Sequence, residues 1–251
     1  MIPDLIYDVG MHNGDDTAYY LSKGFQVVGI EANPVWADFC RRRFSTAISN
    51  GNLLLLNIGI SAREGVQTFW INQEHTEFSS FIPEVAARAG TKAVPIEIPG
   101  IRFSSILREH GIPFYLKSDI ERHDIHCLCA LDANDLPTYI SIEAHELRYL
   151  QILHRLGYNA FKCVDQTAHN FRRDVGPTWV RWCRRKALRA GELLRMYAPT
   201  FKRGSSGPFG EETPGEWQPL EEVMSEWNHL SSRGGRLYRR GWFDFHATVR
   251  S

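Results

Sequence analysis

The chain has 251 residues, of which 43% are hydrophobic, and its 29 basic side chains are balanced by 29 acidic ones. A chain of this length can bury one large core, and a formal net charge of zero argues against a protein that binds nucleic acid over its whole surface. No apolar run of 18 residues is present, and the first residues lack the basic start and apolar core of a signal peptide. Five scattered cysteines favour reduced thiols. We therefore expect a single cytoplasmic domain over residues 1–251, without a membrane partner.

Apolar strands alternate with helices in the first 60 residues. Strands are expected at residues 5–9, 25–30 and 52–58, and helices at residues 15–23 and 34–44. Gly10 and Gly14 bracket the first turn, and Pro34 suits the first position of the second helix. This order of elements is typical of a parallel sheet with right-handed crossovers.

The pattern continues after a less regular stretch. Residues 66–71 predict an edge strand, and residues 94–99 a short strand that contains prolines. Further strands are expected at residues 114–118, 138–142 and 159–164, and helices at residues 102–110, 124–130 and 147–156. Residues 242–249 predict a last strand that closes the sheet from its edge. The sequence thus predicts a doubly wound α/β fold.

The character of the chain changes between residues 166 and 240, which we interpret as a helical, lid-like insertion before the last strand. Residues 171–203 contain ten basic and two acidic side chains, and residues 179–197 predict a basic amphipathic helix. Six glutamates follow between residues 211 and 226. The basic segment could recognise an anionic acceptor or nucleic acid, or it could be a solvated helix paired with these glutamates. The opposite charge of the two segments favours the solvated helix.

The turn after the first strand carries the chemistry that is most informative. A dinucleotide-binding turn has three closely spaced glycines, whereas here His12 stands at the second glycine position, between Gly10 and Gly14. Asp8 and Asp15 would repel a pyrophosphate. The same carboxylates suit a cationic ligand without phosphate, such as S-adenosylmethionine. The alternative is a βα turn with two chance acids.

A second carboxylate supports a nucleoside-containing ligand. Glu31 follows the second strand, 21 residues after Gly10, where an acid can accept hydrogen bonds from both ribose hydroxyls. Enzymes that bind NAD also place a carboxylate there, so Glu31 alone does not distinguish NAD from S-adenosylmethionine. The spacing of Asp8, Gly10 and Gly14 favours S-adenosylmethionine.

Five stretches together resemble the FkbM-type methyltransferases, a branch of the class I S-adenosylmethionine-dependent methyltransferases. They occur in the family's order within residues 1–165: Asp8-Val-Gly-Met-His-Asn-Gly14, Glu31-Ala-Asn-Pro34, Asn57-Ile-Gly-Ile-Ser-Ala-Arg-Glu-Gly65, Phe78-Ser-Ser-Phe81 and Leu116-Lys-Ser-Asp-Ile-Glu-Arg-His-Asp124. The resemblance implies a Rossmann-like, seven-stranded, mostly parallel sheet with an antiparallel edge strand. It also implies O-methylation of a small molecule or sugar, with S-adenosylhomocysteine as the second product.

The resemblance also implies the cofactor-binding residues. Those at the methionine end would be Asp8, Gly10, Asn13, Gly14 and Thr17, and those at the ribose and adenine would be Glu31, Ala32, Ile58 and Gly59. We add three neighbours from the same stretches, namely His12, Asp15 and Asn33. One departure stands out, because Arg122 occupies the place of a family glycine. That change could alter the turn beside the transferred methyl group.

Candidate catalytic residues follow the fourth and fifth core strands, whose carboxyl ends lie side by side in a parallel sheet. They are Asp119, Glu121, Glu143 and His145. We expect Asp119 to orient the cofactor or acceptor, and His145 to be the base because neutral imidazole is available near pH 7. Glu143 and His145 are two residues apart and face the same way on an extended strand end. The alternatives are helix caps, a structural histidine or a divalent metal site, and we expect no metal.

The sequence leaves three functions to compare. The preferred one is a methyltransferase that acts on a hydroxyl of a sugar or small secondary metabolite, with no membrane or nucleic-acid partner. The second is an RNA methyltransferase or RNA-binding module that uses residues 171–203. The third, suggested by Arg122, is a cofactor-binding protein without catalysis. The sequence does not name the acceptor, and it leaves open whether the protein is a homodimer.

Overall fold

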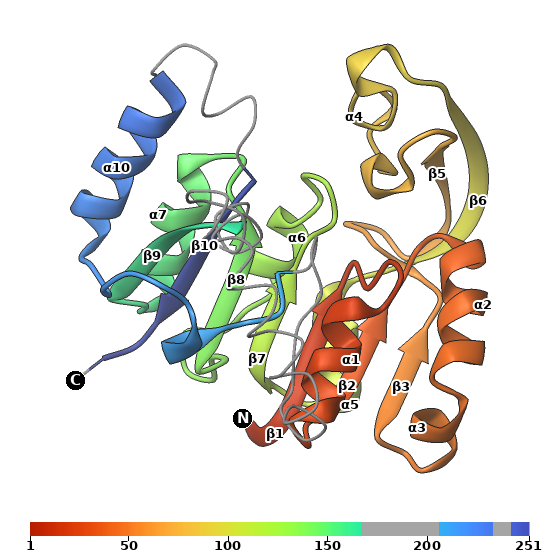
Figure 1. Ribbon diagram of the computed structural model, residues 1–251, viewed down its shortest axis with the longest axis horizontal. Helices are drawn as coiled ribbons and strands as arrows, with labels where there is room; N and C mark the ends of the chain where they lie inside the picture. Colours follow the sequence, from red (N-terminus) through yellow and green to blue (C-terminus); the bar gives the residue numbers. More distant parts are fainter. Residues whose placement is uncertain (167–205, 233–241, 251) are drawn as a thin grey trace, which may run out of the picture.

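The computed structural model describes residues 1–166, 206–232 and 242–250. Ten strands form two sheets in these residues (Figure 1). The main sheet has seven strands in the order β3-β2-β1-β7-β8-β10-β9. Their bounds are Leu53–Leu56 (β3), Gln26–Ile30 (β2), Ile2–Val9 (β1), Pro113–Ser118 (β7), Tyr139–Glu143 (β8), Phe243–Thr248 (β10) and Ala160–Asp165 (β9). Strands β3, β2, β1, β7 and β8 are parallel to one another, and β10 is antiparallel to both β8 and β9. The predicted Rossmann-like, seven-stranded, mostly parallel sheet is confirmed.

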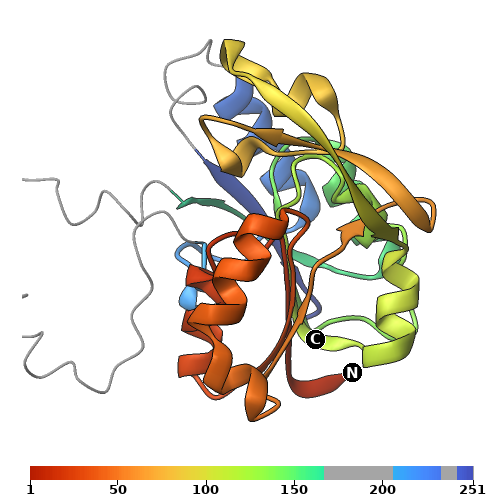
Figure 2. The same ribbon diagram turned by 90° about the vertical axis from the view of Figure 1, so that its right-hand side faces the viewer.

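Helices cover both faces of the main sheet. The first group is Asp15–Ser22 (α1), Pro34–Arg43 (α2) and Ser45–Ser49 (α3), and the second is Phe103–His110 (α5), Ile125–Leu128 (α6), Leu147–Leu156 (α7) and Leu220–Ser232 (α10). In Figure 2, α1 and α2 lie on one side of the sheet and α5 lies on the other. Successive side chains of a strand point to opposite faces, so β1 contributes to two cores. Its Tyr7 and Val9 pack with the second group of helices, whereas Ile6 packs with Tyr20 of α1.

The last strand is not where the sequence placed it. Strand β10 lies between β8 and β9, so the predicted antiparallel edge strand is wrong in its position, and β9 forms the edge. Asp244 of β10 pairs with Glu143 of β8 on one side and with Val164 of β9 on the other. The pattern of apolar residues specifies that a segment is a strand, but it does not specify which neighbours the strand has.

A short segment from the C-terminal part completes the core beside α1. Residues 206–210 are buried, and the ring of Phe209 stacks on that of Tyr115 with the centroids 4.1 Å apart. Phe209 also contacts the rings of Tyr20 and Phe25. The following 3₁₀ turn, Gly210–Glu212 (η3), places Glu212 against Tyr19 and Lys23. Residues 206–212 therefore pack against the domain.

The irregular stretch forms a second sheet of three strands in the order β4-β6-β5. Its strands are Gly59–Ile60 (β4), Ala93–Ile101 (β6) and Gly65–Asn72 (β5), and the short helices beside them are Thr76–Phe78 (η1), Pro83–Ala86 (α4) and Arg88–Gly90 (η2). Residues 66–71 do form an edge strand, but its sheet is this second one. Figure 2 shows that the three-stranded sheet crosses above one end of the main sheet.

The predicted amphipathic helix at residues 179–197 lies outside the described residues, as does the whole basic segment at residues 171–203. In the part of the chain that the structure describes, no helix has the length and apolar character needed to cross a membrane.

Candidate functional site

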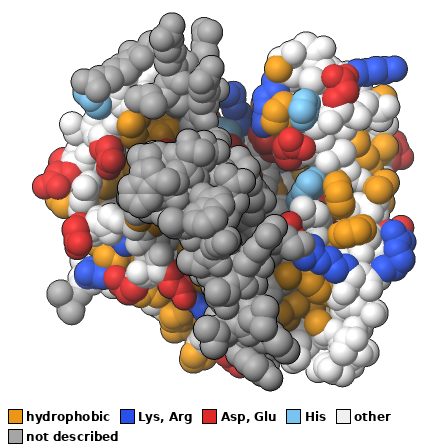
Figure 3. Space-filling view, viewed as in Figure 1, with side chains coloured by type: hydrophobic (Ala, Val, Ile, Leu, Met, Phe, Trp, Pro, Cys, Tyr) orange, Lys and Arg blue, Asp and Glu red, His pale blue; other side chains and the backbone are white. Residues whose placement is uncertain are grey.

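A pocket of about 970 Å³ opens at the carboxyl ends of the parallel strands. One side is built from the residues that follow β1, β2, β7 and β8, and the other from β5, η1, α4 and η2 of the second sheet. On the face seen in Figure 3, acidic and histidine side chains gather beside the hollow between these two parts. The pocket therefore lies at the place where doubly wound folds bind ligands.

Gly10 brings the first turn into close contact with the loop after β7. Its φ is +86°, and a Cβ atom there would lie 1.9 Å from the carbonyl oxygen of Asp119. Gly14 caps α1 with φ +78°, and a Cβ atom there would lie 2.5 Å from the ring of Phe44. Both positions therefore require glycine, and at Gly10 this leaves backbone rather than side chain in the pocket wall.

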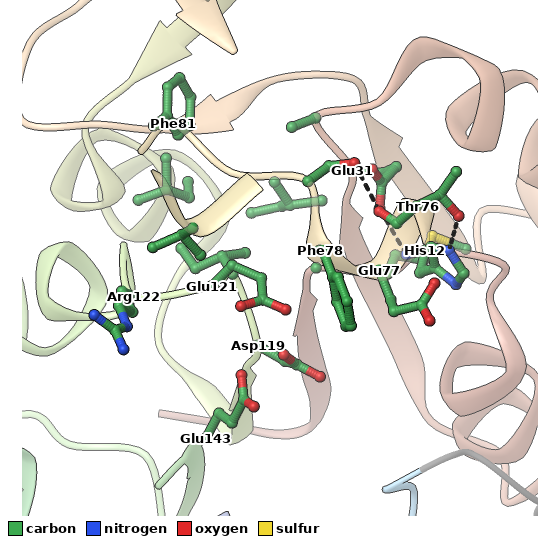
Figure 4. Close-up of a pocket in the computed structure, with 18 of the residues that line it drawn as sticks. His12, Glu31, Thr76, Glu77, Phe78, Phe81, Asp119, Glu121, Arg122 and Glu143 are labelled. Carbon is green, nitrogen blue, oxygen red and sulfur yellow. Dashed lines mark hydrogen bonds between the residues drawn. The ribbon is translucent and has the colours of Figure 1, made fainter. Parts of the chain in front are cut away.

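Glu31 is fixed at the carboxyl end of β2 by the backbone of two different loops. Its Oε2 accepts a hydrogen bond from the backbone N–H of His12 at 2.6 Å (Figure 4), and its Oε1 accepts one from that of Asn33 at 2.7 Å. Burial raises the pKa of Glu31 to about 7, and these two hydrogen bonds oppose that effect. Each carboxylate oxygen can accept a further hydrogen bond, so Glu31 can hold the two hydroxyls of a ribose in the pocket.

His12 connects the first turn to the second sheet. It adopts φ +48°, its Nε2 lies 3.0 Å from Thr76 Oγ1 of η1, and its ring packs at 4.3 Å from that of Trp36. Burial lowers the pKa of His12. The residue that replaces a dinucleotide-binding glycine is therefore a neutral, packed part of the pocket wall next to Glu31, as Figure 4 shows.

Lys117 is the main residue that the sequence left without a role. Its ammonium is buried, and it lies 3.4 Å from Asp8 Oδ1, 3.4 Å from Asp16 Oδ2 and 3.8 Å from Asp119 Oδ2. The neighbouring carboxylates raise the pKa of Lys117 well above its usual value, against the effect of burial. Asp16, rather than the predicted Asp15, belongs to this cluster, because Asp15 forms an ion pair with Arg43 at 2.8 Å.

Arg122 retains the backbone that a glycine would have at its position. Glu121 and Arg122 have φ of +52° and +73°, in the left-handed region. Asp124 holds this turn by accepting hydrogen bonds from the backbone N–H groups of Ile120 and Arg122 and from Ser118 Oγ. The turn beside the expected methyl group is therefore kept, and the side chain of Arg122 lies at the pocket rim.

The four predicted catalytic residues meet in one part of the pocket. Asp119, Glu121 and Glu143 point toward one another in Figure 4, and His145 Nε2 lies 2.8 Å from Glu143 Oε2. Burial, followed by the charges of Asp119 and Glu121, raises the pKa of Glu143 well above its usual value. Glu143 and His145 therefore lie within hydrogen-bond distance of each other, which is the geometry required of an acid–base pair.

Glu121 has a different partner from the other three. Its carboxylate forms a two-pronged ion pair with the guanidinium of Arg88, with Nη2 at 2.6 Å from Oε1, and that guanidinium stacks at 3.7 Å on the ring of Phe78. One ligand atom each from Glu121, Glu143 and His145 lie within 4.8 Å of one another, a spacing that a metal ion could use. Because Arg88 already occupies both oxygens of Glu121, we interpret the cluster as acid–base chemistry.

The structure brings most, but not all, of the predicted cofactor residues to the pocket. Those that line it are Gly10, His12, Asn13, Asp15, Glu31, Ala32, Ile58 and Gly59, whereas Asp8, Gly14, Thr17 and Asn33 lie behind this lining. Asp8 is fully buried and accepts a hydrogen bond from Thr17 Oγ1 at 2.6 Å, so these two residues support the site from inside.

The aromatic residues of the C-terminal part separate into two groups. Trp242 lines the pocket, and so does Trp227 of α10, which the sequence analysis missed. Phe209 is in the core, and Trp217 packs on Tyr139 away from the pocket. Missed as well were Arg88 and Asp244, whose partners are distant in the sequence.

Comparisons with known proteins give likenesses of fold only. No protein-family model and no curated protein matches the chain. One similar solved structure is a precorrin-6y C5,15-methyltransferase from Geobacter metallireducens GS-15, at 13% identity and a TM-score of 0.41, covering 99% of this chain and 80% of that one. Another is an SAM-dependent methyltransferase from Thiobacillus denitrificans in complex with S-adenosyl-L-homocysteine, at 13% identity and a TM-score of 0.39, covering 98% of this chain and 85% of that one. The fold given above rests on the strand order and not on these likenesses.

Proposed function

We propose that the protein is an S-adenosylmethionine-dependent methyltransferase. The observation that carries this proposal is the position of Glu31, held by two backbone N–H groups in the same pocket as the acid-lined Gly10 turn. A ribose-binding carboxylate and a turn with excess negative charge suit a nucleoside that carries positive charge.

The residues of the pocket fit this cofactor better than a dinucleotide. Asp16, Lys117 and Asp119 line the pocket floor near the turn, and Asp8 lies behind them. Together these four groups carry a net charge of −2 when ionised, which opposes a pyrophosphate and attracts an ammonium and a sulfonium. Glu31 would hold the ribose, and Ile58, Gly59 and Ala32 would adjoin the adenine.

Bound S-adenosylmethionine would supply a methyl group on a sulfonium, which is already a good leaving group. The protein then has to orient the acceptor and remove its proton. Asp119 lies between the cofactor side of the pocket and Glu143, where it can orient the acceptor. The acceptor hydroxyl would lose its proton to the imidazole of His145 as its oxygen takes the methyl group, and Glu143, whose Oε2 lies 2.8 Å from His145 Nε2, would orient the ring.

We propose a hydroxyl of a sugar or small secondary metabolite as the acceptor. Supporting this choice, the pocket of about 970 Å³ offers room beyond a cofactor, and carboxylates, Arg88 and two tryptophans line it together. Such a mixture of hydrogen-bonding groups and flat rings suits a polyhydroxylated ligand.

Calorimetric titration with S-adenosylhomocysteine tests the cofactor. Wild-type protein should bind it at micromolar concentrations, and NAD should give no heat of binding. Absence of S-adenosylhomocysteine binding at high micromolar concentration would remove the proposal. For the acceptor, transfer of a labelled methyl group to sugars and hydroxylated metabolites should be lost in His145→Ala while cofactor binding remains.

A further inference from the structure

Lys117 is a buried cation whose surroundings differ from those of Lys162, the other buried lysine among the described residues. Lys162 is equally buried, but it donates hydrogen bonds to the carbonyl oxygen and Oγ1 of Thr213, at 3.1 and 3.2 Å, away from the pocket. Lys117 has three carboxylates within 4 Å and lines the pocket. A buried ion needs such partners, and here they come from β1, α1 and the loop after β7.

Lys117 lies between one carboxylate inside the protein, Asp8, and two that line the pocket, Asp16 and Asp119. Asp8 is fully buried; Thr17 donates to its Oδ2, and no hydrogen bond within the described residues reaches its Oδ1, which lies 3.4 Å from the Lys117 ammonium. On the other side of Lys117, Asp16 and Asp119 line the pocket. The ammonium lies within 4 Å of an oxygen of each of these three acidic neighbours, so its charge draws all three carboxylates toward it.

Without Lys117, these carboxylates would repel one another in a poorly solvated space. Asp8 would retain a proton or turn away, and Asp16 and Asp119 would lose the charge that holds them at the pocket floor. The adenosine side of the pocket would change little, because Glu31 is held by the backbone of residues 12 and 33 and not by this cluster.

We infer that Lys117 is a positioning residue for the amino-acid end of the cofactor, arranging Asp16 and Asp119 to receive its ammonium group. This inference rests on the proposed function. It assigns the two ends of the cofactor to separate parts of the protein, Glu31 for the nucleoside and the Lys117 cluster for the amino acid.

Two ligands that share the nucleoside separate these parts. S-adenosylhomocysteine carries the amino-acid group, and 5′-methylthioadenosine lacks it. Calorimetry on the full chain should show that Lys117→Met raises the Kd for S-adenosylhomocysteine by roughly tenfold to a hundredfold. This is the effect of losing hydrogen bonds to a charged group. Affinity for 5′-methylthioadenosine should stay within about twofold. The matched control Lys162→Met, which also removes a buried ammonium, should leave the ratio of the two affinities unchanged.

Equal weakening of both ligands in Lys117→Met, or an unchanged ratio, would overturn the inference and leave Lys117 as a structural residue. If that variant does not fold, Lys117→Met with Asp8→Asn keeps the net charge of the cluster and leaves Asp16 and Asp119 unchanged, and it should show the same selective loss; a wild-type ratio in this double variant would equally overturn the inference. Wild-type protein that binds neither ligand would instead remove the proposed function itself.

Discussion

Replacing Glu31 by glutamine tests the central feature of the site with a change of almost no volume. Both oxygens of Glu31 accept backbone N–H groups, from His12 at 2.6 Å and Asn33 at 2.7 Å. An amide offers one acceptor and one donor group, so one of these backbone N–H groups must face an NH₂ group. Leaving one buried donor unsatisfied should reduce the free energy of unfolding by about 1–3 kcal/mol.

The same change should weaken every ligand that carries the nucleoside. A hydrogen bond to a charged acceptor contributes about 1.5–3 kcal/mol, so loss of one such bond to the ribose corresponds to roughly a tenfold to 150-fold rise in Kd. Titration calorimetry should show similar losses for S-adenosylhomocysteine and 5′-methylthioadenosine, since both contain the ribose. Urea unfolding of the same samples separates this loss from a loss of folded protein.

Glu77→Gln is the matched control. Glu77 belongs to η1 and lines the same pocket, but its side chain is 56% exposed. Its neutralisation should change neither stability nor affinity appreciably. Folded Glu31→Gln protein with wild-type affinity for both ligands would refute the assignment of Glu31 to the ribose.

Further predictions concern the turns, the core and pH. Gly10→Ala should lower the free energy of unfolding by more than about 3 kcal/mol in urea, since its Cβ would lie 1.9 Å from the carbonyl oxygen of Asp119; a neutral result would contradict the close contact. Arg122→Gly should raise the thermal midpoint through a gain of about 1 kcal/mol, because φ is +73° there, and a lower midpoint would count against strain. Phe209→Ala should lower the free energy of unfolding, measured in urea, by about 3–5 kcal/mol if residues 206–210 belong to the core. Finally, burial raises the pKa of Glu31 from 4.5 to about 7, so the folded protein binds more protons than the unfolded chain in this interval. The stabilising contribution of Glu31 is therefore fully present below pH 4.5 and is lost as pH rises through about 7. Urea unfolding of the wild type and of Glu31→Gln at pH 5 and at pH 8 would detect this loss as a smaller stability difference between the two proteins at pH 8.

Features that depend on neighbouring residues could be predicted from the sequence. The turn from Gly10 to Gly14 and the position of Glu31 follow from the alternation of strands and helices, because parallel strands put their carboxyl ends at one edge. Glu143 and His145 were expected to face the same way at the end of a strand, and in the structure Glu143 Oε2 lies 2.8 Å from His145 Nε2.

Strand β6 shows why the second sheet was missed. Prolines 95 and 99 argue against a strand with neighbours on both sides. In the structure β5 pairs along the whole of β6, but β4 pairs only with Gly100 and Ile101. The prolines therefore lie where β6 has a neighbour on one side only, and that freedom is not visible in the sequence.

The Lys117 cluster could not be predicted for another reason. Its carboxylates, Asp8, Asp16 and Asp119, come from three elements, and the contact of Lys117 with Asp8 joins residues more than 100 positions apart. The position of β10 between β8 and β9 is a similar case, since nothing local in residues 242–249 distinguishes an edge strand from an inner one.

The place of β10 has a consequence for folding. Within the main sheet β9 is hydrogen-bonded only to β10, and residues 166–242 separate the two strands in the chain. A chain that pairs the five parallel strands before β10 joins them presents an open edge at β8 and leaves β9 outside the sheet. Unpaired strand edges attract other chains. We therefore expect the folding intermediate that lacks β10 to be prone to aggregation.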